Sequence, residues 1–148
     1  MSYNWNWGVF LQPSASGDDT YLGWLFTGLK WTISLSLSAW VIALIVGSII
    51  GVLRTVPNRW LSGFATGYVE LFRNIPLLVQ LFIWYFVLPE LLPPDLGNAF
   101  KQSNPLWQQF FSAMLCLGLF TSARVAEQVR SGINALPKGQ RAAGLAMG

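Results

Sequence analysis

Charged and amide side chains gather in one stretch of an otherwise apolar sequence. Glu70 and Arg73 are three residues apart, so on a helix they share a face and can form an ion pair. Gln80 follows, inside an uncharged run that covers residues 74–89. We consider two interpretations. Glu70, Arg73 and Gln80 belong to a translocation path or gate for an anionic solute, or the helix begins later and both charges lie at the membrane interface.

Enzyme chemistry has few candidate residues in this chain. There is no histidine, and the one cysteine, Cys116, lies inside an apolar run. The sequence contains no G-x-x-x-x-G-K-[ST] phosphate-binding loop and no set of nucleophile and base that could be assembled. We therefore expect no catalytic residue, no metal site, no cofactor and no nucleotide site in this chain.

The composition indicates a membrane protein. Apolar residues make up 53% of the 148 residues and charged residues only 10%, whereas soluble domains carry about 25% charged residues. Nine Lys and Arg residues against six acidic ones are scattered along the chain, and nucleic-acid binding would need them clustered on one face. The composition thus excludes a soluble enzyme, a disordered linker and a nucleic-acid binder, and it predicts an all-α membrane fold.

Three segments are predicted to span the bilayer, near residues 31–53, 63–88 and 106–123. The first has no charged residue and as a helix would be about 34 Å long, enough to cross a hydrocarbon core of about 30 Å. Pro76 lies inside the second segment and predicts a kink there. Pro105 favours a helix start just before the third segment.

The distribution of charge predicts the orientation of these spans, because Lys and Arg are enriched in cytoplasmic segments. Basic residues exceed acidic ones in the 54–59 connection and in the tail, residues 124–148. Acidic residues exceed basic ones in the N-terminal part and in the 90–105 connection. We expect residues 1–29 outside and residue 148 in the cytoplasm.

Small residues recur every fourth position in the first span, at Ala39, Ala43, Gly47 and Gly51. Such a face lets two helices approach closely in lipid. Shorter repeats of the same kind occur at Gly63 and Gly67 and at Gly118, Ser122 and Ala126. The spacing predicts close helix packing but leaves open whether the partner helix belongs to this chain or to another. Three spans with small-residue faces are too few to enclose a polar path alone, so we expect an oligomer or a heteromer.

Several stretches resemble one family of transport proteins. Residues 126–140 (AEQVRSGINALPKGQ) resemble the start of the cytoplasmic coupling loop of bacterial ABC importer permeases. Residues 68–80 (YVELFRNIPLLVQ) are similar to the polar amino-acid, or histidine/glutamine-type, branch of that family. Residues 5–8, 54–59 and 89–93 resemble the glutamate/aspartate permeases in particular. The resemblance covers nearly the whole chain.

This resemblance implies a fold, a function and partners. The fold is the type I ABC importer permease fold of about five spans, so residues 30–148 would form a part of that domain that stops inside the coupling loop. The function is that of an inner-membrane permease subunit in an ATP-driven amino-acid importer for glutamate or aspartate. The partners are the lipid bilayer, a second permease subunit, a cytoplasmic ABC ATPase dimer and a periplasmic amino-acid-binding protein.

The resemblance also implies which residues couple the permease to the ATPase. They lie in the tail: Pro137, Gly139, Gln140, Ala143 and Gly148. The family signature Glu-Ala-Ala-x-x-x-Gly departs here, because Ala142 stands at the glutamate position and Gly144 at the second alanine. The resemblance therefore implies the backbone shape of the loop but not a salt bridge from that glutamate.

Two other functions are consistent with the same sequence. The chain could be a non-transporting scaffold or assembly subunit whose basic tail docks on a partner, or a non-functional permease fragment. Capture by cross-linkers at Lys138 or Arg141 of a partner other than an ATPase would favour the scaffold.

Overall fold

The structure, a computed structural model, describes residues 5–137. Helices account for most of these residues, so the predicted all-α class is confirmed. The chain divides into two compact units, residues 1–36 and 37–148. In the first unit a short 3-10 helix, η1 (Trp7–Leu11), is followed by a turn in which Pro13 and Thr20 form an isolated bridge. All the packing described below lies in the second unit.

Helix α1 (Tyr21–Leu53) is one of two described helices that are individually long and apolar enough to cross a membrane. It begins well before Trp31, the predicted start of the first span. Lys30 directly precedes the uncharged run that predicted the span. A single lysine does not interrupt backbone hydrogen bonding, and no proline occurs between residues 21 and 30, so the helix can begin earlier than that run. The helix and the uncharged run therefore have different lengths.

The predicted second segment, residues 63–88, is not a single kinked helix. It is divided into α2 (Arg59–Asn74), α3 (Leu77–Phe82), the π-helical turn η2 (Ile83–Val87) and α4 (Leu88–Leu91). The chain bends by 102° between α2 and the helical stretch that begins at Leu77. Pro76 has no N–H and drives the residue before it out of the helical region; accordingly, Ile75 is extended, with φ −89° and ψ 125°.

The third segment is longer than predicted. After the short helix α5 (Pro94–Gln102), helix α6 runs from Pro105 to Asn134, beyond the predicted end at residue 123. Its start fits the proline signal: Pro105 is the first helical residue, and the Asn104 side chain accepts a hydrogen bond from Leu106 N at 2.9 Å. The first part of the tail thus continues the same helix.

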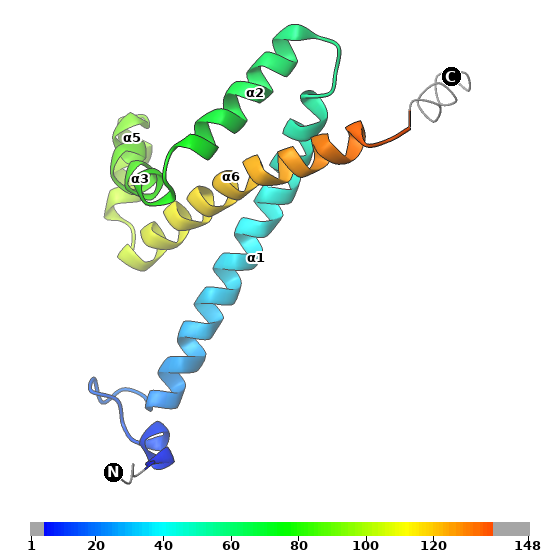
Figure 1. Cartoon of the computed structure of the whole chain (residues 1–148). Helices are drawn as coiled ribbons and strands as arrows, with labels where there is room; N and C mark the ends of the chain where they lie inside the picture. Colours follow the sequence, from blue (N-terminus) through cyan, green and yellow to red (C-terminus); the bar gives the residue numbers. More distant parts are fainter. Residues whose placement is uncertain (1–4, 138–148) are drawn as a thin grey trace. The chain divides into compact units, whose positions relative to one another are not determined.

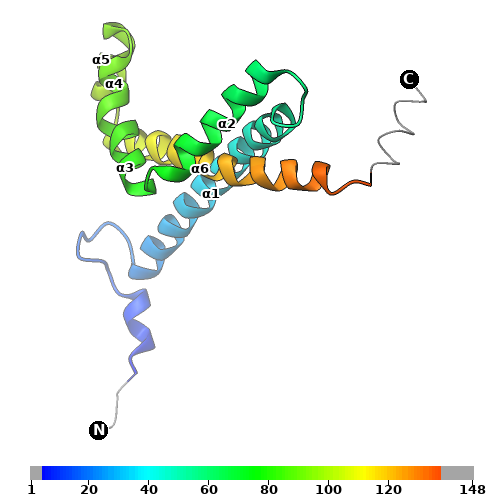
Figure 2. The same ribbon diagram turned by 45° about the horizontal axis from the view of Figure 1, so that its top comes forward.

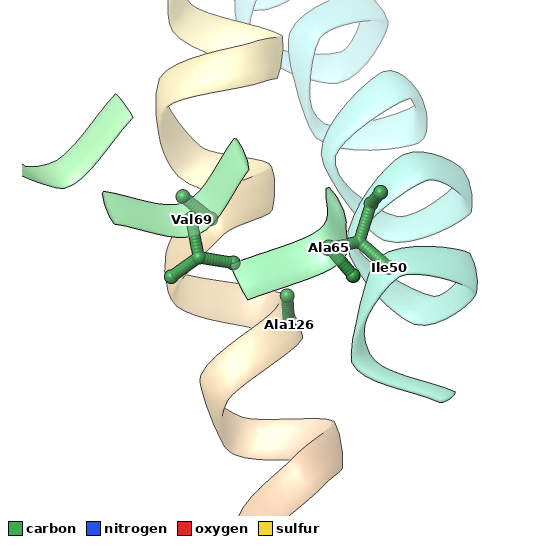
Figure 3. Packing of buried hydrophobic residues seen from close by; sticks show 5 residues of the cluster. Ile50, Ala65, Val69 and Ala126 are labelled. Atoms are coloured by element: carbon green, nitrogen blue, oxygen red, sulfur yellow. The ribbon is translucent and has the colours of Figure 1, made fainter. Parts of the chain in front are cut away.

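Figures 1 and 2 both show α2 lying against the middle of α6. The hydrophobic core is small and lies where α1, α2 and α6 meet; Figure 3 shows Ile50 of α1, Ala65 and Val69 of α2, and Ala126 of α6 converging there. Large apolar side chains outside this core are exposed, including Trp40, Ile45, Phe64 and Phe111. Such an exterior is typical of helices that face lipid or other subunits.

Candidate functional site

The small-residue face of α1 packs against α6 of the same chain. Ala39, Ala43, Gly47 and Gly51 are all buried. A Cβ atom added to Gly47 would lie 2.6 Å from Val125 Cβ and 2.7 Å from Ser122 O. The two backbones therefore approach so closely that only glycine fits.

Two more glycines extend this contact along both helices. A Cβ on Gly51 would lie 2.7 Å from Val129 Cβ and 2.8 Å from Ala126 O. On the facing helix, a Cβ on Gly118 would lie 2.8 Å from Ile42 Cγ2. By contrast, a Cβ atom added to Gly63 or Gly67 of α2 would meet no atom of another described segment within 4 Å. The sequence left open which helix packs against the small-residue face of α1. In the structure that helix is α6 of the same chain.

An arginine–glutamate cluster lies beside this packing interface. The Glu127 carboxylate of α6 accepts hydrogen bonds from three guanidinium groups. Arg54 Nη1 is 2.6 Å from Glu127 Oε1, Arg73 Nη1 is 3.3 Å from the same oxygen, and Arg130 Nε is 3.0 Å from Oε2. Arg54 follows the last residue of α1 and Arg73 is in the last turn of α2. One carboxylate therefore connects three helices (hereafter the Glu127 cluster).

The partners of Glu127 differ in exposure. The Arg54 side chain is only 12% exposed, whereas that of Arg73 is 54% exposed. A charge that is nearly removed from solvent depends strongly on its counter-charge, and an exposed pair contributes little. Arg54 is thus the firmly held partner and Arg73 is the one that can exchange with solvent or another group.

Glu70 and Arg73, whose spacing allows an ion pair, do not form one among the described residues. Arg73 is directed to Glu127 instead, while Glu70 is exposed and lines an open hollow on α2 with Arg59, Gly63 and Gly67. The pairing with Glu127 joins residues 54 positions apart in the sequence, so no helical spacing rule could find it. One signal was available: Glu127 is the only acidic residue in the tail and stands between Arg124 and Arg130.

Gln80 stabilises the end of α2. Its Nε2 atom donates to Phe72 O and to Ile75 O, both at 2.9 Å, and its side chain is buried. These carbonyls belong to the last turn of α2 and to the bend, where the helix can no longer supply donors. Gln80 is therefore a side-chain cap that holds the broken end of α2 against the start of α3.

Replacement of Gln80 by alanine should lower the free energy of unfolding by about 1–3 kcal/mol, because two partly buried carbonyls lose the donor that a buried amide supplies. Gln108 offers a matched control: its Nε2 donates to Lys101 O and Ser103 O at the end of α5, at an exposed position. Gln108→Ala should cost about 1 kcal/mol or less, since water can replace the amide. Denaturation of both variants in detergent micelles measures the difference; equal losses would show that burial at Gln80 has no special role.

Tyr68 and the buried Ser122 form a polar contact near the core. Tyr68 Oη lies 2.7 Å from Ser122 Oγ, so this contact joins α2 to α6. Among residues 5–137 no group of three His, Cys, Asp or Glu side chains could hold a metal ion. Of the expected coupling residues, Pro137 is exposed just after α6, and Gly139, Gln140, Ala143 and Gly148 lie outside the described residues.

Comparison with known proteins identifies a family that covers most of the chain. Residues 43–148 match the family described as "Binding-protein-dependent transport system inner membrane component". The chain is 61% identical over 149 residues to the glutamate/aspartate import permease protein GltJ of Escherichia coli (strain K12), an alignment that covers 100% of the chain and 61% of the relative. It is 34% identical over 127 residues to the glutamate/aspartate import permease protein GltK of Escherichia coli O157:H7, which covers 86% of the chain and 55% of the relative.

A solved structure shares the fold. The crystal structure of an amino acid ABC transporter with histidines superposes with a TM-score of 0.67 and 30% sequence identity. The match covers 86% of this chain and 54% of the solved one. The chain thus spans between half and two thirds of the length of the relatives that it matches here.

Proposed function

Since the chain belongs to the family of inner membrane components of binding-protein-dependent transport systems, we propose that it is the permease part of an ATP-driven importer of glutamate and aspartate. The membership confirms the resemblance to polar amino-acid ABC importer permeases and a multi-pass location in the inner membrane. The observation that carries the choice of solute is the 61% identity to GltJ over the whole chain.

We propose three spans for this part of the permease: α1, the broken pair of α2 with α3–α4, and α6. Their orientation across the membrane follows the charge pattern, with residues 1–29 outside and the tail, residues 124–148, in the cytoplasm. The importer would be completed by a second permease subunit and a periplasmic amino-acid-binding protein. The pair of relatives GltJ and GltK supports an arrangement with two permeases.

The proposed path runs past the break between α2 and α3. Backbone that leaves the helical conformation at membrane depth is tolerated only where protein buries it or where it lines an aqueous cavity. Gln80 supplies the donors for this break, and Arg73 projects from the last turn before it. Glu70, Arg73 and Gln80 are therefore proposed as path or gate residues, with Arg73 alternating between Glu127 and an anionic solute.

Coupling to a cytoplasmic ATPase dimer is assigned to the tail. Helix α6 is continuous from the core at Ala123 and Ala126 to Asn134, so a movement applied at Asn134 would reach the Glu127 cluster along one unbroken helix. Gly139, Gln140, Ala143 and Gly148 are proposed as contacts with the ATPase. ATP is bound by that partner, because this sequence has no phosphate-binding loop.

Transport by vesicles that contain the complete importer tests the proposed function. Labelled glutamate should accumulate only when ATP is inside the vesicle and the binding protein is outside. Accumulation without ATP would overturn the proposal. Cysteines introduced at Lys138 and Arg141 should cross-link to the ATPase; capture of a different partner, together with absent transport, would favour the scaffold function instead.

A further inference from the structure

Arginines outnumber acidic groups in the hollow next to the Glu127 cluster. The hollow is open to solvent and is lined by Arg73, Arg124, Glu127, Gln128, Arg130 and Ser131. Three arginines face one carboxylate here, and that carboxylate already pairs with Arg54 from the other side. No other described acidic side chain lines this hollow. The positive charge is therefore only partly compensated within the described chain.

The arginines keep hydrogen-bond donors for a ligand. Each guanidinium has five N–H groups. Arg73 uses Nη1 and Arg130 uses Nε to reach Glu127, and within the described part of the chain the other nitrogens of both have no hydrogen-bond partner. Arg124 lies with its guanidinium carbon 4.3 Å from the centre of the Phe120 ring, a cation–π contact that orients the group without consuming its donors. Gln128 and Ser131 add neutral donors at the rim.

We propose that this hollow binds the phosphate of an anionic phospholipid headgroup. Arginine forks match the oxygens of a phosphate in a bidentate way. The hollow lies along residues 124–131 of α6, and Arg54, which pairs with Glu127 there, directly follows α1. In the orientation proposed above, with residues 124–148 in the cytoplasm, the hollow lies at the cytoplasmic interface, where basic pockets between transmembrane helices bind lipid headgroups. The hollow is open to its surroundings. An open site can admit a lipid headgroup, whereas a solute path would be expected to be enclosed.

This inference rests on the orientation given under Proposed function, and its test uses Arg124 and Arg130, which are not among the proposed path residues. A bound headgroup would occupy donors of Arg73 and so favour its release from Glu127, since both use the same guanidinium. The lipid would then weaken the exposed Arg73–Glu127 pair, which joins α2 to α6. The Arg54–Glu127 pair, which joins the end of α1 to α6, would stay in place.

Native mass spectrometry of the delipidated chain in a neutral detergent tests the proposal. Phosphatidylglycerol should bind to the wild type in preference to zwitterionic phosphatidylcholine. The double variant Arg124→Gln/Arg130→Gln should bind phosphatidylglycerol roughly thirtyfold more weakly, as expected for the loss of two arginines at a membrane surface. Arg59→Gln, on the α2 hollow, removes one positive charge elsewhere and should bind as the wild type does.

Additional arms identify the source of the anion and guard against misfolding. Arg130→Lys retains the charge but loses the fork, so it should bind with intermediate affinity; circular dichroism checks that each variant stays helical. Inorganic phosphate and glutamate are added as soluble competitors. Equal binding by wild type and double variant, displacement of the lipid by millimolar inorganic phosphate, or displacement by glutamate would each overturn the lipid assignment.

Discussion

Replacement of Gly47 by alanine should destabilise the chain by about 1–3 kcal/mol, and Gly47→Leu should abolish packing of α1 on α6. The added Cβ would meet Val125 Cβ at 2.6 Å and the backbone oxygen of Ser122 at 2.7 Å. A rotamer change relieves neither contact, because the Cβ atom of Val125 is fixed by its backbone and the Ser122 oxygen belongs to the backbone of α6. The helices must therefore separate, and the dispersion contacts that hold them together in lipid weaken along the whole interface.

Titration with sodium dodecyl sulfate from a mild detergent, followed by circular dichroism and tryptophan fluorescence, measures this effect. Gly132→Ala is the matched control, since it is also a helical glycine and a Cβ there meets nothing within 4 Å. It should raise stability by about 0.5–1 kcal/mol through the loss of backbone freedom in the unfolded state. If Gly47→Ala behaves as Gly132→Ala does, the close approach of α1 and α6 is incorrect.

The sequence allowed the helix pairing to be anticipated in part. Spacing of four residues placed Ala39, Ala43, Gly47 and Gly51 on one face, because a helix has 3.6 residues per turn. It could not identify α6 as the partner, since that choice depends on which of several small-residue faces fits at a given register. Gly63 and Gly67 have the same spacing, but a Cβ atom added to either would meet no other described segment within 4 Å.

The break between α2 and α3 and the ion pairs of Glu127 also depend on residues that are distant in the sequence, so sequence spacing predicted them only in part. Pro76 predicted an interruption, but a bend of 102° also depends on the buried Gln80, which supplies donors for the freed carbonyls. The Arg54–Glu127 bond joins residues 73 positions apart. Local rules consider partners three or four residues away and therefore favoured Glu70 for Arg73, although the fold brings Glu127 to both arginines.

Replacement of Glu127 by glutamine should lower the free energy of unfolding by about 2–3 kcal/mol, since it leaves three arginines without their shared carboxylate. Most of this loss should come from Arg54, whose side chain is 12% exposed and whose Nε atom is buried with no hydrogen-bond partner among the described residues. Arg73→Gln should therefore have a much smaller effect than Arg54→Gln. Denaturation of the three variants in one detergent gives the comparison.

Glu90 provides the control for a loss of charge alone. Glu90 Oε1 and Lys101 Nζ are 2.6 Å apart, but the two side chains are 66% and 41% exposed. Solvent screens such a pair, so Glu90→Gln should cost about 1 kcal/mol or less, and salt should reduce even that difference. The two glutamates make ion pairs of equal shortest length, so a larger loss at Glu127 would come from burial and from its three partners. Equal losses at both positions would mean that the Glu127 cluster does not hold α1, α2 and α6 together.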